Sequence, residues 1–204
     1  MSARAGAQFL DKARLMLRDR TGVAALEFAL IMSLLLALYL VTMEVAQAIE
    51  ANKKVARVGS MVADLVTQMP AINKSELEGI MRIGEATLQP YNRSKPSIMV
   101  TAIEVDEDTP EALVVWSRKL VNGAFSTGLE EDDVITDLPP ALRINGTFLV
   151  RVESSLAYRP VITWAASSKT TLGLTAAFDV ISMKETYHLR PRRSTDIPCD
   201  DCYD

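Results

Sequence analysis

One acidic side chain lies inside a long apolar run near the start of the chain. From Val23 to Met43 the sequence reads VAALEFALIMSLLLALYLVTM, and Glu27 is its single charged residue. A helix of about 20 apolar residues crosses the hydrocarbon core of a bilayer. An ionised carboxylate in such a segment costs roughly 2.5 to 3.5 kcal/mol on insertion scales, so it indicates a function and a partner of opposite charge. Glu27 is therefore the first candidate functional residue.

Two cysteines form the pattern Cys199-Asp-Asp-Cys202. An oxidising compartment favours a disulfide between them, although so small a ring stabilises a fold less than a long one. Three alternatives stay open: free or intermolecular thiols, redox catalysis, and half of a two-cysteine metal site. Thioredoxin-like chemistry needs the pair at a helix start in a βαβ unit, and Pro198 precedes the first cysteine here. We expect a small structural disulfide.

Other residues that could carry catalysis are isolated. His188 is the only histidine, and no serine, cysteine or carboxylate pair has the surroundings of a nucleophile with its base. The acidic stretch from Glu130 to Asp133 could bind calcium outside the cytoplasm. It lacks the alternating ligands and the glycine of an EF-hand loop, so we interpret it as a solvated charge run. The sequence predicts no catalytic residue, no cofactor and no resident metal ion, and we expect a protein that is not an enzyme.

Charge is distributed unevenly on the two sides of the apolar run. Five basic and two acidic residues precede it, whereas 17 basic and 22 acidic residues lie between Ala46 and Asp204. By the positive-inside rule, residues 1–22 stay in the cytoplasm and the part after the span is exported. The formal net charge of −4 argues against nucleic acid as a partner, because phosphate binding needs a clustered positive field. We predict a single-pass membrane protein that contacts lipid.

A cleaved secretory signal is the alternative explanation of a basic segment followed by apolar residues. The apolar region of such a signal is normally about 7 to 15 residues long and ends at a small-residue cleavage site. Ala46-Gln47-Ala48 formally fits a cleavage site, but the run before it is longer and carries Glu27 near its entrance. The sequence therefore favours a span that stays in the protein over a secretory signal that is removed at Ala46-Gln47-Ala48.

The segment from Gly22 to Phe28, followed by the apolar helix, resembles the class III signal of type IV pilins. More narrowly, residues 22–31 (GVAALEFALI) resemble the start of the TadE/TadG-like pseudopilins of the tight-adherence (Tad/Flp-type) pilus system. The resemblance implies that a prepilin peptidase cuts between Gly22 and Val23, which leaves 204 − 22 = 182 residues. It also implies that Glu27 and Phe28 act in assembly. The carboxylate of Glu27, one helical turn after Val23, would then meet the new ammonium group of a neighbouring subunit.

Two departures bear on the branch of the family. Ser33 stands where many members carry proline; proline would bend the helix, whereas serine bonds to a carbonyl one turn back and bends it only slightly. No Asp-x-Ser-x-Ser signature follows the span, although the longer TadG-type members often carry one. Of the two branches, TadE is the nearer resemblance.

Several expectations follow from this resemblance. It implies a minor pseudopilin of the bacterial inner membrane, with its N-terminus in the cytoplasm and its C-terminal part in the periplasm. Its partners would be prepilin peptidase, other pilins or pseudopilins and the inner-membrane pilus platform, and the pilus could serve cell adhesion. One alternative is an uncleaved, signal-anchored periplasmic binding or scaffold protein that supports secretion. Another is a membrane-bound redox protein that uses Cys199 and Cys202.

Hydrophobic periodicity predicts the elements that position these residues. No proline interrupts the chain before Pro70, so one helix over 23–69 is expected, with a hinge near Gly59 as the alternative. A second helix starts at Asn73 or Ser75 and ends near Leu88. Alternating or β-branched runs predict strands over 97–105, 113–120, 147–158 and 176–189.

These elements predict an α+β fold in which a single N-terminal transmembrane helix continues as a long amphipathic helix packed on a small antiparallel sheet, as in pilins. We divide the chain into five parts. These are a cytoplasmic basic leader (1–22), a transmembrane helix (23–45), its amphipathic extension (46–70), a periplasmic α+β domain (71–192) and a tail with the cysteine pair (193–204).

Overall fold

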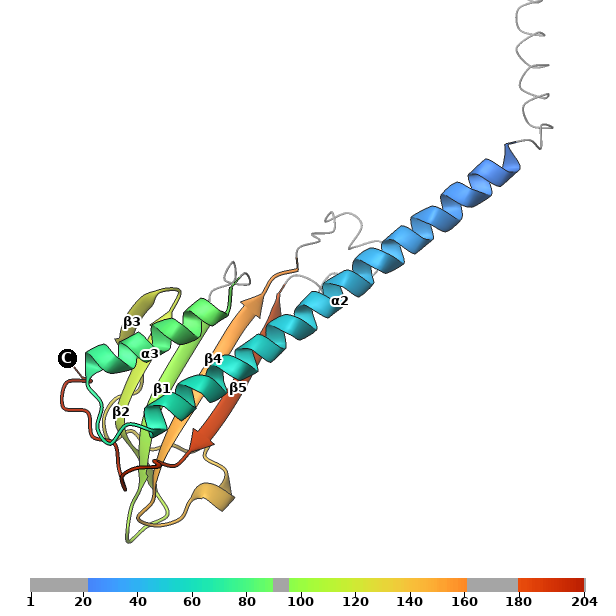
Figure 1. Ribbon diagram of the computed structural model, residues 1–204. Helices are drawn as coiled ribbons and strands as arrows, with labels where there is room; N and C mark the ends of the chain where they lie inside the picture. Colours follow the sequence, from blue (N-terminus) through green and yellow to red (C-terminus); the bar gives the residue numbers. More distant parts are fainter. Residues whose placement is uncertain (1–21, 90–95, 161–179, 204) are drawn as a thin grey trace, which may run out of the picture. The chain divides into compact units, whose positions relative to one another are not determined.

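The computed structural model describes residues 22–89, 96–160 and 180–203 (Figure 1). The elements in chain order are α2 (Val23–Thr67), α3 (Lys74–Thr87), β1 (Pro96–Val105), β2 (Ala112–Val121), β3 (Ala124–Thr127), the 3₁₀ helix η2 (Pro140–Leu142), β4 (Phe148–Tyr158) and β5 (Ile181–Leu189). A long helix with an apolar N-terminal part and a small antiparallel sheet confirm the predicted α+β fold class.

The chain divides into two compact units, Met1–Val45 and Ala46–Asp204, and α2 contributes to both. This helix is unbroken at Gly59, so the alternative of a hinge at that position is wrong. It ends at Thr67, two residues before the predicted end. Pro70 explains the difference, because proline disfavours the helical conformation in the residue that precedes it.

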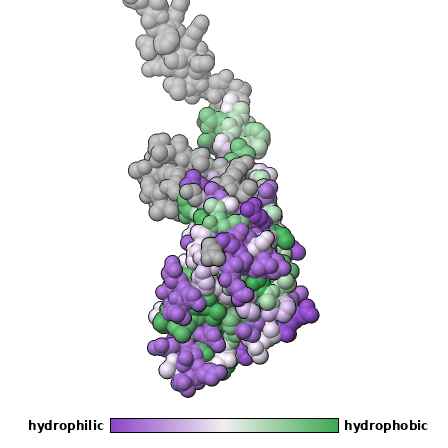
Figure 2. Space-filling model, turned by 90° about the vertical axis from the view of Figure 1, so that its left-hand side faces the viewer, coloured by the Kyte–Doolittle hydropathy of each residue, from purple (hydrophilic) through white to green (hydrophobic). Residues whose placement is uncertain are grey.

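In the first unit, α2 exposes its apolar side chains. Leu26 is 65% exposed and Leu34 is 70% exposed, and no residue of the most apolar 18-residue window is buried. The helix is long and apolar enough to cross a membrane. In Figure 2 the visible part of this segment is green, whereas purple predominates on the visible face of the second unit. Ser33 donates its hydroxyl to the carbonyl of Ala29 at 2.8 Å, which satisfies the hydroxyl inside the helix.

The second unit contains a five-stranded antiparallel sheet with strand order β3-β2-β1-β4-β5. Asn122 and Gly123 connect β2 to β3 with φ values of 51° and 81°. Two successive positive φ values are typical of a type I′ turn, which the Asn-Gly pair predicts. The short strand β3 itself was not predicted, because its four residues are too few to show an alternating pattern.

The other boundaries lie close to their predicted positions. β1, β2 and β4 differ from the predicted ranges by one residue at one or both ends. β5 begins at Ile181 rather than at residue 176; residues 176–179 lie outside the described residues. The helix α3 begins after Asn73, which accepts a hydrogen bond from the Glu76 amide at 2.9 Å, while the Glu76 carboxylate accepts one from the Asn73 amide. This reciprocal capping box fixes the start of α3.

The two helices cover one face of the sheet, which we call the helix face (Figure 1). Glycines allow their close approach. A β-carbon at Gly59 of α2 would lie 2.7 Å from Ser154 Oγ on β4 and 2.8 Å from the ring of Tyr187 on β5. Similarly, a β-carbon at Gly84 of α3 would lie 2.8 Å from Val62 Cγ2 of α2. The second half of α2 therefore packs in contact with both β4 and α3.

The loop between β3 and β4 covers part of the opposite face. Ile135 and Leu138 are 5% and 2% exposed and pack with Ile103 and Leu149. The acidic side chains from residue 130 to 133 are exposed, as a solvated charge run requires. The loop is therefore exposed at its acidic residues and buried at these two apolar residues.

Candidate processing site and C-terminal clasp

The proposed cleavage point coincides with the start of α2. Gly22 is an exposed turn residue, and Val23 is the first residue of the helix. The carbonyl of Gly22 accepts the first helical hydrogen bond, from the amide of Leu26 at 3.1 Å. Among the described residues, a β-carbon at Gly22 would meet nothing within 4 Å. The described surroundings of Gly22 therefore leave room for the start of a side chain.

Glu27 and Phe28 lie in the first turns of the same helix and are both exposed. Glu27 is four residues after Val23, so the two lie on one face of the helix, one turn apart. Phe28 is 64% exposed and belongs to the apolar surface of the first unit. The structure thus places the carboxylate of Glu27 one turn after Val23, the residue that would carry the new amino group after cleavage.

The second feature is the segment 190–203, which follows β5 and which we call the C-terminal clasp. Three of its backbone groups bond to other elements. The Arg192 amide donates to the carbonyl of Thr67 at 2.9 Å, and the Pro198 carbonyl accepts from the Ile72 amide at 3.1 Å. The Ile197 carbonyl accepts from Trp116 Nε1 at 2.7 Å, inside the core. The clasp therefore connects the end of α2, the loop before α3 and the strand β2.

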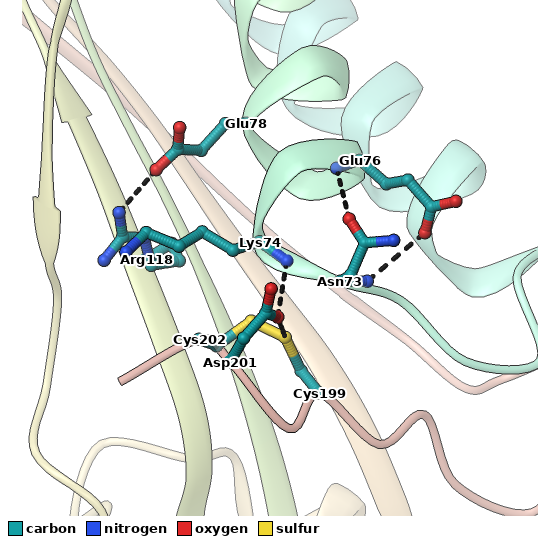
Figure 3. A network of polar contacts seen from close by, with 8 residues as sticks. All are labelled: Asn73, Lys74, Glu76, Glu78, Arg118, Cys199, Asp201 and Cys202. Carbon is teal, nitrogen blue, oxygen red and sulfur yellow. Dashed lines mark hydrogen bonds and ion pairs between the residues drawn. A yellow bond between two sulfur atoms is a disulfide. The ribbon is translucent and has the colours of Figure 1, made fainter. Parts of the chain in front are cut away.

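Inside the clasp, Cys199 and Cys202 form a disulfide. Cys202 is fully buried, Cys199 is 9% exposed, and both belong to the apolar core of the helix face. Between them, Asp201 Oδ1 accepts a hydrogen bond from the backbone amide of Lys74 at 2.7 Å (Figure 3). Lys74 is the first residue of α3, so this carboxylate lies at the positive end of the helix dipole.

Among the described residues, Cys199, Asp201 and Cys202 form a cluster that could bind a metal ion. Their two sulfur atoms and one carboxylate oxygen lie within 4.8 Å of one another. A cysteine binds a metal ion as its thiolate, whereas both sulfurs here are joined in a disulfide. Asp201 already accepts the Lys74 amide. In the oxidised state this group is arranged to cap a helix.

An ion pair between a buried arginine and a partly exposed glutamate lies next to the clasp on the helix face. Arg118 of β2 is 5% exposed and pairs with Glu78 of α3, which fixes α3 over β2 (Figure 3). Nearby, the Tyr203 hydroxyl donates to the carbonyl of Val115. Burial, and then the carboxylates of the acidic loop, raise the pKa of Tyr203 to about 12, so this hydroxyl stays protonated at any physiological pH.

The only histidine lies on the opposite face of the sheet. His188 of β5 is paired in register with Arg151 of β4, which binds Asp137 at 2.8 Å. Burial, and then the charge of Arg151, lower the pKa of His188 below 6.5. Its neutral form is therefore favoured near neutral pH. In the described part of the structure His188 Nε2 has no hydrogen-bond partner, and we find no nucleophile bonded to it.

Sequence reasoning selected Gly22, Glu27 and the cysteines as candidates from local patterns. It missed Asp201 as a helix cap and Trp116 as the donor to Ile197. No local signal identifies either residue, because their partners are far away in the chain.

The model of the TadE-like protein family matches residues 22–64. This match begins at Gly22 and follows α2 almost to its end. It confirms the TadE-like resemblance of the N-terminal segment, while the sheet and the clasp lie outside the matched region. No curated protein and no solved structure matches the chain.

Proposed function

We propose that the protein is a minor pseudopilin that assists assembly of a Tad/Flp-type pilus and is cleaved by prepilin peptidase between Gly22 and Val23. The observation that carries the proposal is the coincidence of three positions. The TadE-like match begins at Gly22, the helix begins at Val23, and the lone carboxylate of the span follows one turn later.

The surroundings of Gly22 suit a protease substrate. It is exposed and precedes the helix. Glycine has no side chain, so its backbone can enter a narrow protease cleft in an extended conformation. Among the described residues, a β-carbon at Gly22 meets nothing within 4 Å, so a substitution there has room for its first side-chain atom. Loss of processing in a Gly22 variant whose second unit stays folded would therefore report on the peptidase.

Cleavage would give Glu27 its partner. The new ammonium group at Val23 would lie in the apolar part of the chain, where an isolated charge is unfavourable. In a bundle of such helices, the carboxylate of one subunit and the ammonium of the next neutralise each other. The exposed apolar side chains around Phe28 supply the surface for lateral packing of these helices. The role is structural and uses no catalytic residue, cofactor or metal ion.

The proposed topology follows the charge distribution. The basic leader stays in the cytoplasm, residues 23–45 cross the bacterial inner membrane, and the sheet lies in the periplasm. The partners are prepilin peptidase, other pilins or pseudopilins and the pilus platform in the membrane.

N-terminal sequencing of the protein from membranes tests the processing step. We expect a terminus at Val23 in cells that contain prepilin peptidase, and an uncut terminus in cells that lack it and in the variant Gly22→Arg. The matched control is Gly79→Arg, because Gly79 is likewise a glycine with open space around it but lies in α3. A terminus at Met1 or Ser2 in every sample would refute processing and favour the signal-anchored scaffold.

A second variant tests assembly separately. Glu27→Gln should be cut normally but should reach the pilus fraction at most one tenth as often as the parent, because the ammonium group loses its counter-charge. Glu50→Gln is the control, since Glu50 lies on the same helix after the span and pairs at 3.9 Å with Lys54. Equal recovery of both variants with the pilus would contradict the role of Glu27.

A further inference from the structure

The C-terminal clasp (190–203) has no secondary structure of its own and is held by individual backbone and side-chain contacts, including those of the buried Ile197 and Cys202. Its described residues form turns, bends and irregular chain. It nevertheless covers the start of α3 and the edge of a buried tryptophan, through Asp201 and Ile197. Segments without a ladder of backbone hydrogen bonds open locally at lower free energy than the strands of a core. A constraint that joins the contacts of the clasp should therefore raise the free energy of its opening.

The disulfide supplies that constraint at the centre of the contacts. On one side of the ring, Ile197 and Pro198 accept the bonds from Trp116 and Ile72; on the other side, Tyr203 bonds to β2. Closing the ring removes conformations in which the segment before Cys199 and the segment after Cys202 move apart. Both segments therefore pack on the rest of the unit together. Without the ring, each contact must immobilise its own part of the chain.

We propose that the Cys199–Cys202 disulfide is a redox-controlled lock, which holds the C-terminal clasp closed after oxidation and lets it open locally when the pair is reduced. The inference does not depend on cleavage after Gly22. It assigns the cysteine pair to a conformational device, not to catalysis.

The chemistry of locking is a thiol–disulfide exchange with a disulfide oxidant. One cysteine thiolate attacks the oxidant and expels one of its thiols, and the second cysteine thiolate then displaces the remaining thiol as the new S–S bond forms. The cysteine pair loses two electrons and two protons, and the oxidant leaves as two thiols. Because Cys202 is fully buried and Cys199 is 9% exposed, a thiol reaches the closed lock only after the clasp opens. The closed state therefore protects its own disulfide.

Hydrogen–deuterium exchange with mass spectrometry tests the lock on the full chain in detergent. The protein is compared in three states: oxidised with glutathione disulfide, reduced with dithiothreitol until thiol labelling is complete, and reoxidised. The reporter amides are those of Ile72 and Lys74, whose acceptors belong to the clasp, together with the clasp peptide itself. The reference amides are those of the central strand β1.

We expect at least tenfold faster exchange of the reporter amides in the reduced protein, unchanged protection of β1, and recovery after reoxidation. The variant Cys199→Ala/Cys202→Ala should behave as reduced under both conditions. Asp200→Ala is the matched control, because Asp200 is an exposed residue of the same ring, and it should behave as the parent. Equal exchange of oxidised and reduced protein would overturn the proposal. Loss of protection in β1 together with the clasp would also overturn it, since the disulfide would then stabilise the whole unit.

Discussion

The close contact of α2 with β4 and β5 at Gly59 gives a sharp prediction for the variant Gly59→Ala. The added β-carbon would lie 2.7 Å from Ser154 Oγ and 2.8 to 2.9 Å from the Tyr187 ring, closer than carbon atoms approach these groups. Ser154 cannot move freely, because its hydroxyl donates to the carbonyl of Val55 at 2.9 Å in the buried interface. The helix, the strand or both must shift.

Three contributions set the magnitude. Overpacking a core costs about 1 to 3 kcal/mol, and breaking the buried Ser154 hydrogen bond would add about 1 to 3 kcal/mol. Replacing glycine by alanine inside a helix returns about 1 kcal/mol. We expect Gly59→Ala to lower the free energy of unfolding by about 1 to 5 kcal/mol. With a urea m-value of about 2 kcal/mol per molar, the midpoint falls by roughly 0.5 to 2.5 M.

The assay is urea unfolding of the full chain in detergent, followed by the fluorescence of buried Trp116 in a Trp164→Phe background. Gly79→Ala is the matched control, because a β-carbon at Gly79 meets nothing within 4 Å. It should stabilise by about 0.5 to 1 kcal/mol through helix propensity alone. If Gly59→Ala stabilised the protein as much as Gly79→Ala does, then close packing would not be the reason for glycine at position 59, and helix flexibility would be the better explanation.

Two other predictions concern the clasp and the histidine. Trp116→Phe removes the donor to the buried Ile197 carbonyl at 2.7 Å, so it should cost about 1 to 3 kcal/mol in urea unfolding; a loss below 0.5 kcal/mol would contradict this bond. Burial and then a neighbouring arginine lower the pKa of His188 in the folded protein below 6.5. As the pH falls through 6.5, the unfolded chain therefore binds more protons than the folded chain does. Stability should therefore decrease from pH 7.5 to pH 5.5, and this slope should vanish in His188→Gln, which is informative because the chain has one histidine.

The helices were predictable because their signals are local. The start of α3 follows from Asn73 and Glu76, which cap each other within one turn. The end of α2 follows from Pro70 to within two residues. The main strands were also predictable, because apolar residues alternate along them. These patterns depend on near neighbours in the sequence, and the folded structure did not change them.

The tertiary arrangement was not predictable in the same way. β1 pairs with β4 as well as with β2, although more than 40 residues separate β1 from β4. The contact of Asp201 with Lys74 spans 127 residues. Such contacts arise from the packing of the complete unit, so neither residue carries a local mark of its role. The candidate processing residues could be proposed from the sequence for the opposite reason, since a peptidase that cut after Gly22 would recognise a short segment and not a folded surface.

The strand order has a consequence for how the second unit folds. β1, β2 and β3 form a meander whose hairpins close over short loops, whereas β4 must return from a distant part of the chain to pair with β1. Closing a long loop costs entropy before its contacts form, so pairings of this kind slow folding. Ser154, which holds α2 through Val55, lies on that late strand. The meander should therefore form first, and the part of α2 around Val55 and Gly59 should remain uncovered until β4 arrives.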